Sequence, residues 1–461
     1  MAKLLKQWEP EDPKFWQEQG KKIAERNLWI SIPSLLLAFV VWQLWSIIVL
    51  YMPSIGFHYN DNELMWLTAL PALSGATLRI FYAFIVPVFG GRRWTAFSTA
   101  TLLIPTIGIG ICIQDPTTSF STMAILSLLC GLGGANFSSS MANIGYFFPK
   151  SEKGKATGAN AGFGNLGVSV VQFVIPFVIG VSIFGVIGGA PQIIADNNGQ
   201  MASIWLQNAS YVWVPFIILA IIFAWFGMND IASAKASFSD QTVIFKRKDT
   251  WIMCWLYLGT FGSFIGFSAA LPLLIKREFP LENPLTYAFL GPLIGSVFRV
   301  IGGALSDKIG GTKVTQWSFI AMTLCVVAIL YFLPSGEIAG NFTGFLISFL
   351  LFFTFVGLGN GSTFAQVPNI FIQFHQRLAK GKDEQAHQHA MLNANKESGA
   401  VLGFIGAIGA YGGFVIPRMN GMSITYTGSI EAAFYFFIVF YVSCVITNWW
   451  FYARKNTQTL R

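Results

Sequence analysis

The sequence predicts an all-α membrane protein with 12 transmembrane helices, built as two pseudo-symmetric six-helix bundles of the same orientation. The composition is the first reason, because 54% of the residues are hydrophobic and only 11% are charged. A soluble domain is nearer to about a quarter charged. The second reason is that apolar stretches recur along the whole chain, and the third is that landmarks in the first half return in the second.

The apolar stretches are each long enough to cross a bilayer, which takes about 20 residues. They cover roughly residues 30–52, 63–89, 95–113, 121–148, 155–186, 208–227, 250–272, 284–305, 314–333, 343–374, 391–417 and 429–452. We therefore expect two six-helix bundles, the first over residues 30–227 and the second over residues 250–452. A linker over residues 228–249 joins them, and an N-terminal segment (1–29) and a tail (453–461) flank them. We expect the linker, the segment and the tail to be cytoplasmic. The first segment is charged and lacks the apolar run of a secretory signal.

The net charge of +8 reports orientation rather than a nucleic-acid partner. With both termini inside, the inside loops hold 24 of the 29 lysines and arginines. Lys276, Arg277 and Arg418 fall outside, and Arg79 and Arg299 fall within the membrane. This is the positive-inside bias of membrane proteins.

The chain shows no pattern typical of an enzyme, a metal site or a cofactor site. Its five cysteines all fall in predicted spans and no CxxC pair exists, which argues against disulfides and zinc. There is no GxxxxGK[ST] phosphate loop, so an ATP-driven pump is not expected. No nucleophile–base pair stands out either, so we expect neither catalysis nor a cofactor.

An internal repeat relates the two halves. Arg79 and Arg299 each precede a Gly-Gly pair by the same distance. The interval from Gly131 to Asn143 equals the interval from Gly357 to Asn369. The interval from Gly162 to Pro176 likewise equals the interval from Gly403 to Pro417. The matches lie six spans apart, so the halves are parallel. Parallel six-span halves are the arrangement of major facilitator transporters, which bind substrate at the midplane between them. The linker, polar and mixed in charge, is the expected hinge.

Arg79 and Arg299 are the strongest candidates for a binding site. A charged side chain at the bilayer centre costs at least about 2.5–3.5 kcal/mol and is rarely there without a partner. No acidic residue lies in either stretch. A guanidinium can donate two parallel hydrogen bonds to a flat oxyanion. Two such groups from opposite halves would clamp one small anion, although each could instead reach an interface or cap a carbonyl.

For the other candidate binding residues, a structural role is an equal or simpler explanation. Asn165 lies in a glycine-rich span and either donates to an anion or makes an interhelical hydrogen bond. Glycines at intervals of three and four in spans 5 and 11 permit close helix contact. Phenylalanine is so common here, with 44 residues, that packing is the default role for any one of them.

No Asp, Glu or His lies in the middle of any predicted span. His58 falls in the first outside loop, His375, His387 and His389 around the loop after span 10, and Glu397 at the inside edge of span 11. Proton-coupled carriers usually hold such a group within the membrane. Its absence favours exchange or uniport over proton symport.

At this point the chain resembles the nitrate/nitrite porter family of the major facilitator superfamily over nearly its whole length. The motifs that carry the resemblance are GANFSSSMANI, GFGNLGVSVVQ, WFGMND, TFGSFIGFS and GFIGAIGAYGGFVIP. GGALSDKIGG, with Asp307 as its acid, resembles the general superfamily loop motif. The equivalent loop after span 2 has Pro87 where that acid would sit, which departs from the pattern.

The resemblance implies a set of site residues. Arg79 and Arg299 would be the paired arginines that bind nitrate, and Asn165 a polar contact. The aromatic lining would comprise Phe39, Phe137, Tyr257 and Phe261, and Gly164 and Gly406 would face the pocket. We therefore expect a monomeric carrier in the bacterial inner membrane that exchanges nitrate and nitrite by alternating access.

Three alternatives stay open. The same fold could run nitrate–proton symport, or it could carry a bulkier anion such as a phosphate ester. The chain could also be a membrane sensor or an anion channel that does not exchange its ligand.

Overall fold

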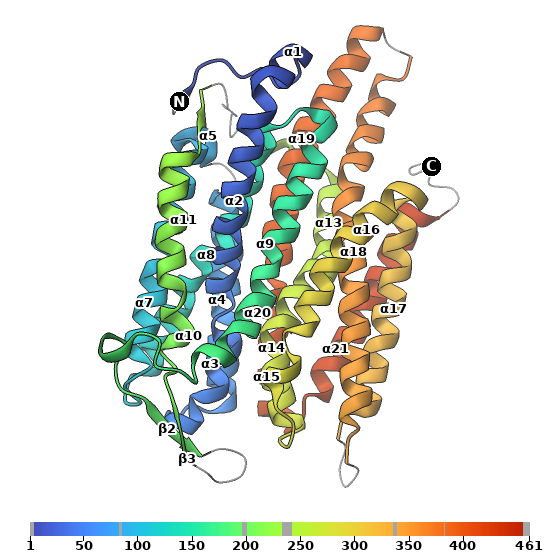
Figure 1. Ribbon diagram of the computed structural model, residues 1–461. Helices are drawn as coiled ribbons and strands as arrows, with labels where there is room; N and C mark the ends of the chain where they lie inside the picture. The colour runs from blue at the N-terminus through green and yellow to red at the C-terminus, as the bar shows by residue number, and fades with distance from the viewer. Residues whose placement is uncertain are drawn as a thin grey trace. The chain divides into compact units, whose positions relative to one another are not determined.

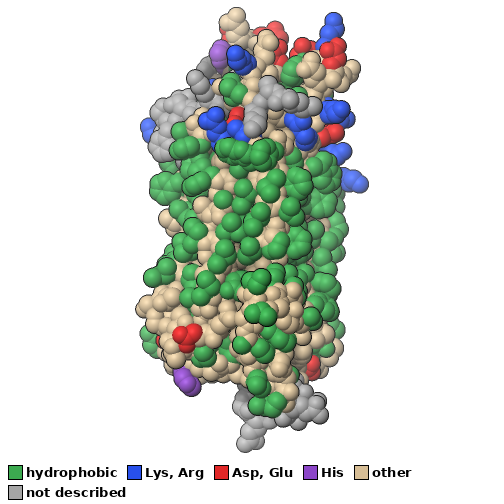
Figure 2. All heavy atoms as spheres, turned by 60° about the vertical axis from the view of Figure 1, so that its left-hand side comes forward, with side chains coloured by type: hydrophobic (Ala, Val, Ile, Leu, Met, Phe, Trp, Pro, Cys, Tyr) green, Lys and Arg blue, Asp and Glu red, His purple; other side chains and the backbone are tan. Residues whose placement is uncertain are grey.

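The structure is a computed structural model that describes residues 4–82, 85–195, 201–232, 242–334, 339–381 and 383–454. Within these ranges, 12 helical segments are long and apolar enough to cross a membrane, as the sequence predicts. The expected linker and tail lie partly outside the described ranges, at residues 233–241 and 455–461. On the face seen in Figure 2, hydrophobic side chains cover the middle and lysines and arginines gather at one end.

The chain divides into two compact units. The first comprises Met1–Lys235, Gly266–Leu293 and Gly413–Gly428, and the second comprises Ala236–Ile265, Ile294–Gly412 and Ser429–Arg461. These units do not coincide with the two halves of the sequence, because two short stretches of the second half group with the first. The division into bundles at residues 30–227 and 250–452 therefore remains a prediction.

The first half of the chain forms the helices drawn from blue to green in Figure 1. They are α1 (Pro13–Phe15), α2 (Lys21–Trp42), α3 (Trp45–Tyr51), α4 (Asp61–Tyr82), α5 (Val86–Phe89), α6 (Gly91–Thr101), α7 (Leu103–Cys112), α8 (Phe120–Phe147), α9 (Lys150–Val178), α10 (Asn208–Tyr211) and α11 (Trp213–Gly227). A π-helical turn, η1 (Trp16–Gly20), joins α1 to α2. The helix thus begins at Pro13, well before the predicted first span. Span 5 ends at Val178, earlier than expected.

Four short strands make two small sheets in the described part of this half. β1 (Leu4–Leu5) pairs in parallel with β4 (Asp230–Ile231). β2 (Gln192–Ala195) pairs antiparallel with β3 (Met201–Ile204). Figure 1 shows this hairpin at the end of the first unit that lies away from the N-terminus.

The second half of the chain forms a corresponding series of helices. They are α13 (Lys248–Tyr257), α14 (Ser263–Glu278), α15 (Pro284–Tyr287), α16 (Leu290–Ile309), α17 (Gly311–Phe332), α18 (Phe342–Ala379), α19 (Glu384–Ala410), α20 (Gly412–Thr427) and α21 (Glu431–Asn448). A π-helical turn, η5 (Leu258–Gly262), joins α13 to α14. Such turns often occur at functional sites.

The glycines of the repeat set the spacing of equivalent helix pairs. In the first unit, a Cβ on Gly131 of α8 would lie 2.6 Å from the backbone nitrogen of Gly75 in α4. In the second, a Cβ on Gly357 of α18 would lie 2.5 Å from the carbonyl oxygen of Gly295 in α16. Gly75 and Gly295 each stand one helical turn before the arginine of their helix. The repeat therefore places both arginines one turn from a close helix contact that needs glycine.

Prolines inside two helices create carbonyl groups that other helices use. Proline lacks the N–H that would bond the carbonyl four residues earlier. Pro71 leaves the carbonyl of Leu67, which accepts a hydrogen bond from Ser127 at 2.7 Å. Pro272 leaves the carbonyl of Ser268, which accepts from Gln172 at 2.7 Å. Both bonds lie within the first unit, and the second joins α14 to α9.

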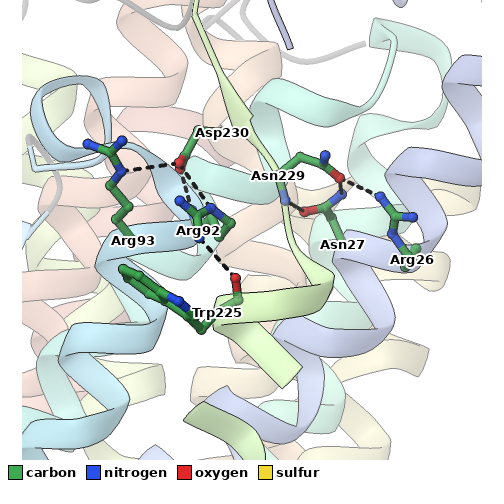
Figure 3. A network of polar contacts seen from close by, with 7 residues as sticks. All are labelled: Arg26, Asn27, Arg92, Arg93, Trp225, Asn229 and Asp230. Atoms are coloured by element: carbon green, nitrogen blue, oxygen red, sulfur yellow. Dashed lines mark hydrogen bonds and ion pairs between the residues drawn. The ribbon is translucent and has the colours of Figure 1, made fainter. Parts of the chain in front are cut away.

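The loop after α4 is completed by an acid from another part of the chain (Figure 3). The carboxylate of Asp230 accepts hydrogen bonds from the backbone nitrogen of Arg92 at 2.9 Å and from its Nε at 3.2 Å. The Nε of Arg93 lies 3.7 Å from the same carboxylate. Gly90 has a φ of 85°, and a Cβ there would lie 2.5 Å from Asp230. Pro87 stands where the loop motif would have an acid, but Asp230, the last residue of WFGMND, provides a carboxylate to this loop instead.

Next to Asp230, the start of the linker is tied to α2 (Figure 3). The backbone nitrogen of Asn229 donates to Asn27 at 2.8 Å, and the amide of Asn27 donates back to Asn229 at 3.2 Å. Arg26 donates to the Asn229 side chain as well. The linker therefore leaves the first unit from a fixed point.

We predict that Asp230→Asn destabilises the protein far more than Asp307→Asn. Removing one partner of a buried ion pair leaves the other charge uncompensated, at about 3–5 kcal/mol. Asp230 and Arg92 are both buried, whereas Asp307, at the equivalent loop after α16, is exposed. Thermal unfolding of the two purified variants in detergent tests this. Equal midpoints would show that Asp230 does not hold this loop.

Candidate functional site

Arg79 lies in α4 with its side chain fully buried and oriented by neutral groups. Its Nε donates a hydrogen bond to the carbonyl of Gly134 in α8 at 2.7 Å. Its guanidinium carbon lies 4.8 Å from the ring centre of Phe137 and 4.9 Å from that of Trp42. A carbonyl and two aromatic faces orient a guanidinium and attract it, but they do not neutralise its charge.

The aromatic residues around Arg79 support one another. Phe39 packs edge-on against Phe137 at 6.2 Å and against Trp42 at 5.5 Å. The indole nitrogen of Trp42 donates to the carbonyl of Pro71 at 2.8 Å, which fixes the ring. The structure thus places Phe137 at Arg79, with Phe39 packed against it, and adds Trp42, which was not predicted.

Asn165 is fully buried in α9, and neither atom of its amide has a hydrogen-bond partner among the described residues. Its neighbours Gly164 and Gly167 face α2, where a Cβ on Gly164 would lie 2.7 Å from Leu35. Asn165 instead shares its helix face with Gln172, two turns further on. The interhelical hydrogen bond considered from sequence is therefore not seen, whereas Gly164 has a packing role.

Arg299 lies in α16 and is held by the second unit in a similar way. It is 6% exposed, and its Nη2 donates a hydrogen bond to the hydroxyl of Tyr257 at 3.2 Å. Its guanidinium carbon lies 5.8 Å from the ring centre of Phe261 and 5.5 Å from that of Phe364. The rings of Tyr257 and Phe261 stack at 5.4 Å. Both predicted aromatic residues therefore lie at Arg299, and Phe364 joins them.

Gly406 is buried in α19, one turn before Gly409. A Cβ on Gly409 would lie 2.8 Å from the ring of Tyr257. This turn of α19 therefore packs where the aromatic residues of Arg299 lie.

The missed aromatic residues had weak sequence signals. Phe364 follows the Gly357 landmark by two turns, and Trp42 follows Phe39 by three residues. Neither stands out in a chain with 44 phenylalanines and 15 tryptophans. Only the positions of the arginines in the repeat would have directed attention to them.

A buried cluster of titratable groups lies in the second unit, near the loop where the sequence places His375. His375 lies inside α18, and its Nε2 is 3.2 Å from the carboxylate of Glu397 in α19. Arg247 donates two hydrogen bonds to the same carboxylate, at 2.8 and 2.9 Å. The end of the linker is thereby fixed to the second unit. Sequence could not show this, because α18 and α19 extend well beyond their apolar stretches.

Contacts within the first unit join α14 and α20 to the first half of the chain. Arg277 pairs with Asp61, and Lys276 donates to the carbonyl of Leu50. Arg418 donates to Asn62 at 2.6 Å, with its guanidinium carbon 3.9 Å from the ring centre of Trp66. We call these contacts the outer latch. Each of the three basic residues that the sequence analysis expects outside, as exceptions to the positive-inside trend, takes part in one of these contacts.

Among the described residues, no group of three or more His, Cys, Asp or Glu side chains is placed to hold a metal ion. The candidate site consists of two buried arginines with aromatic neighbours, one set in each unit. Twelve spans, a parallel repeat and such arginines define a polytopic carrier of small anions.

Comparison with known proteins agrees with this class. The Major Facilitator Superfamily matches residues 34–394. The chain is 50% identical to the nitrate/nitrite transporter NarU of Escherichia coli K12, over 98% of this chain and 97% of the relative. It is 41% identical to the probable nitrate/nitrite antiporter NarK2 of Thermus thermophilus, over 98% and 97%, and 25% identical to the nitrite extrusion protein of Bacillus subtilis, over 95% and 97%.

The chain belongs to the nitrate/nitrite porter family of the Major Facilitator Superfamily. It is thus a membrane transporter and not an enzyme.

We predict that Asn165→Leu leaves the unfolding midpoint unchanged or raises it when no anion is present. Replacing a buried polar group that has no partner removes a desolvation cost and no hydrogen bond. Asn27→Leu is the matched control, because Asn27 bonds Asn229 in both directions. That variant should lose about 1–3 kcal/mol. A strongly destabilised Asn165→Leu protein would mean that the amide has a structural role.

Proposed function

We propose that the protein exchanges nitrate and nitrite across the bacterial inner membrane, and that Arg79 and Arg299 bind the transported anion. The observation that carries the proposal is that both arginines are buried, at equivalent places of the repeat, against neutral partners. A guanidinium matches a flat oxyanion with two parallel hydrogen bonds. The names of the relatives supply the identity of the anion.

The surrounding residues suit a small anion. We propose that Phe39, Phe137, Tyr257 and Phe261 line its site and exclude water, which strengthens each charged hydrogen bond. Asn165 offers a neutral donor. Gly164 and Gly406 contribute by keeping the helices close. A bulky ester would need space that side chains of this size fill.

Exchange follows from the charge of the site. Under this proposal, two guanidinium groups serve one anion and would repel each other when the site is empty, and closing the site in a low dielectric would make that repulsion stronger. A bound monovalent anion offsets one of the two charges and bridges them. The loaded carrier therefore changes conformation more easily than the empty one, and one anion must be exchanged for another.

The outer latch supports alternating access. For an anion to enter from that side, α14 and α20 must separate from α4 and α3, so the latch contacts must break. We propose that this side faces outward and that both termini are cytoplasmic. The gathering of lysines and arginines at the opposite end in Figure 2 supports this orientation. One chain supplies both arginines, so we propose that a monomer transports.

One observation favours nitrate–proton symport as a second candidate. His375 and Glu397 form a buried titratable pair in the second unit. Exchange remains the better proposal, because Arg247 bonds both oxygens of Glu397 and so stabilises its charged form.

We predict that Arg79→Lys and Arg299→Lys each weaken nitrate binding at least about ten-fold. Lysine keeps the charge but loses the planar fork, and a hydrogen bond to a charged group contributes about 1.5–3 kcal/mol. Titration of nitrate into the purified variants measures this. Arg93→Lys is the control, because the Arg93 side chain is 68% exposed. Wild-type affinity in both arginine variants would contradict the proposed site.

We also predict that nitrate uptake into reconstituted vesicles needs nitrite or nitrate inside. Uptake into nitrite-loaded vesicles should greatly exceed uptake into vesicles that contain no substrate anion. Equal uptake by the two would rule out obligatory exchange. An inward proton gradient that drives uptake into the substrate-free vesicles would establish symport instead.

A further inference from the structure

Asn360 of α18, like Asn165, is a buried amide without a partner in the part of the chain that the structure describes. Its side chain is 1% exposed, and neither its Nδ2 nor its Oδ1 has a hydrogen-bond partner among the described residues. Buried amides are nearly always hydrogen-bonded, so each exception needs an explanation such as a ligand or an ordered water. Asparagine is also a poor residue for the interior of an apolar helix. Neither packing nor helix propensity therefore accounts for it.

The neighbours of Asn360 on α18 show where its side chain points. Gly357 and Gly361 face α16, because a Cβ on either would meet the backbone of Gly295 or Arg299. Thr363 faces η5, where its hydroxyl lies 3.1 Å from that of Thr260. Successive side chains of an α-helix are about 100° apart. Asn360 therefore points between these two faces, towards the space that α16 and η5 share.

That space holds Arg299. Phe364 stands one turn after Asn360 on the same side of α18, and its ring contacts both the guanidinium of Arg299 and the ring of Tyr257. On α16, one turn before Arg299, the hydroxyl of Ser296 is also buried without a partner in the described chain. Among the described residues, two unpaired polar side chains therefore lie near the arginine. Asn360 is one turn from Phe364, and Ser296 is one turn from Arg299 itself. A ligand with hydrogen-bond acceptors would explain both.

The repeat gives an independent reason for an amide at this place. The offset that relates Gly162 to Gly403 relates Asn165 to Gly406. The second half therefore has no amide at the position where the first half has Asn165. Asn360, on a different helix, supplies one.

We propose that the side-chain amide of Asn360 donates a hydrogen bond to the oxyanion bound at Arg299. This inference rests on the proposed function and adds a residue to its site. The amide is neutral, so it adds a directional donor without further charge repulsion. Each unit then contributes one guanidinium and one carboxamide, but from different helices of the repeat.

The test measures nitrate affinity of the full-length protein in detergent for Asn360→Leu and Asn360→Asp. Asn369→Leu is the matched control, because Asn369 lies on the same helix but is exposed. We expect Asn360→Leu to bind nitrate about ten-fold more weakly, as for a lost hydrogen bond to a charged ligand. Its unfolding midpoint without nitrate should not fall. Asn369→Leu should bind as the wild type does.

The aspartate variant adds a readout that a structural role would not change. A carboxylate of the same shape repels the anion or pairs with Arg299, whereas the protonated acid is neutral and can donate. Nitrate binding by Asn360→Asp should therefore be lost near neutral pH and recover as the pH falls and the carboxyl takes up a proton, while the wild type and Asn360→Leu change little.

Each outcome decides a specific point. Wild-type affinity in Asn360→Leu, with lost affinity in Arg299→Lys, overturns this inference and leaves the proposed function intact. Unchanged binding in both variants overturns both proposals. An Asn360→Asp protein whose affinity follows that of the wild type across pH overturns the inference as well.

Discussion

The buried guanidinium groups are the constraint on which the remaining structure depends. A charge in an apolar interior must be oriented, and must keep enough polar contact to be tolerated. Arg79 obtains this from a backbone carbonyl and Arg299 from a phenol, each with aromatic faces beside it. The repeat therefore conserves the place of the arginine and its glycine contact. The group that orients the arginine differs between the halves.

The same constraint explains why polar groups within the helices are satisfied so specifically. Proline frees a carbonyl in the middle of α4 and of α14, and a side chain from a neighbouring helix bonds each one. In lipid an unsatisfied carbonyl is costly, so each proline requires such a partner. Not every buried polar group has such a partner: Asn165, Asn360 and Asn420 are buried with both amide atoms unpaired among the described residues. Each such group needs an explanation, such as a ligand or an ordered water.

Sequence could predict the 12 spans from hydropathy, and it singled out both arginines from the repeat and from the chemistry of a buried charge. The four aromatic residues were expected only from the family resemblance, because packing is the default role of an aromatic residue in so apolar a chain. The role of all these residues in binding stays a prediction. Sequence could not predict that Asp230 completes the loop at Arg92, since the two are far apart along the chain. The cluster at Glu397 was missed for another reason. Apolar stretches end where the bilayer ends, but α18 and α19 continue beyond them. Phe364 was missed because the chain has 44 phenylalanines, and nothing in the sequence distinguishes this one.

The ion pair within the first half is more buried than the ion pair that joins the two halves of the sequence, and this difference in burial suits a carrier that changes conformation. Asp230 with Arg92 is buried, at 8% and 5% side-chain exposure, and holds together parts of the first half. Asp61 with Arg277 is far more exposed, at 55% and 27%, and joins the two halves of the sequence within the first unit. Exposed pairs contribute about 0–1 kcal/mol, whereas breaking buried ones costs about 3–5 kcal/mol. The pair that is costly to break thus lies within the first half, and the weak pair lies where the proposed alternating access would require separation.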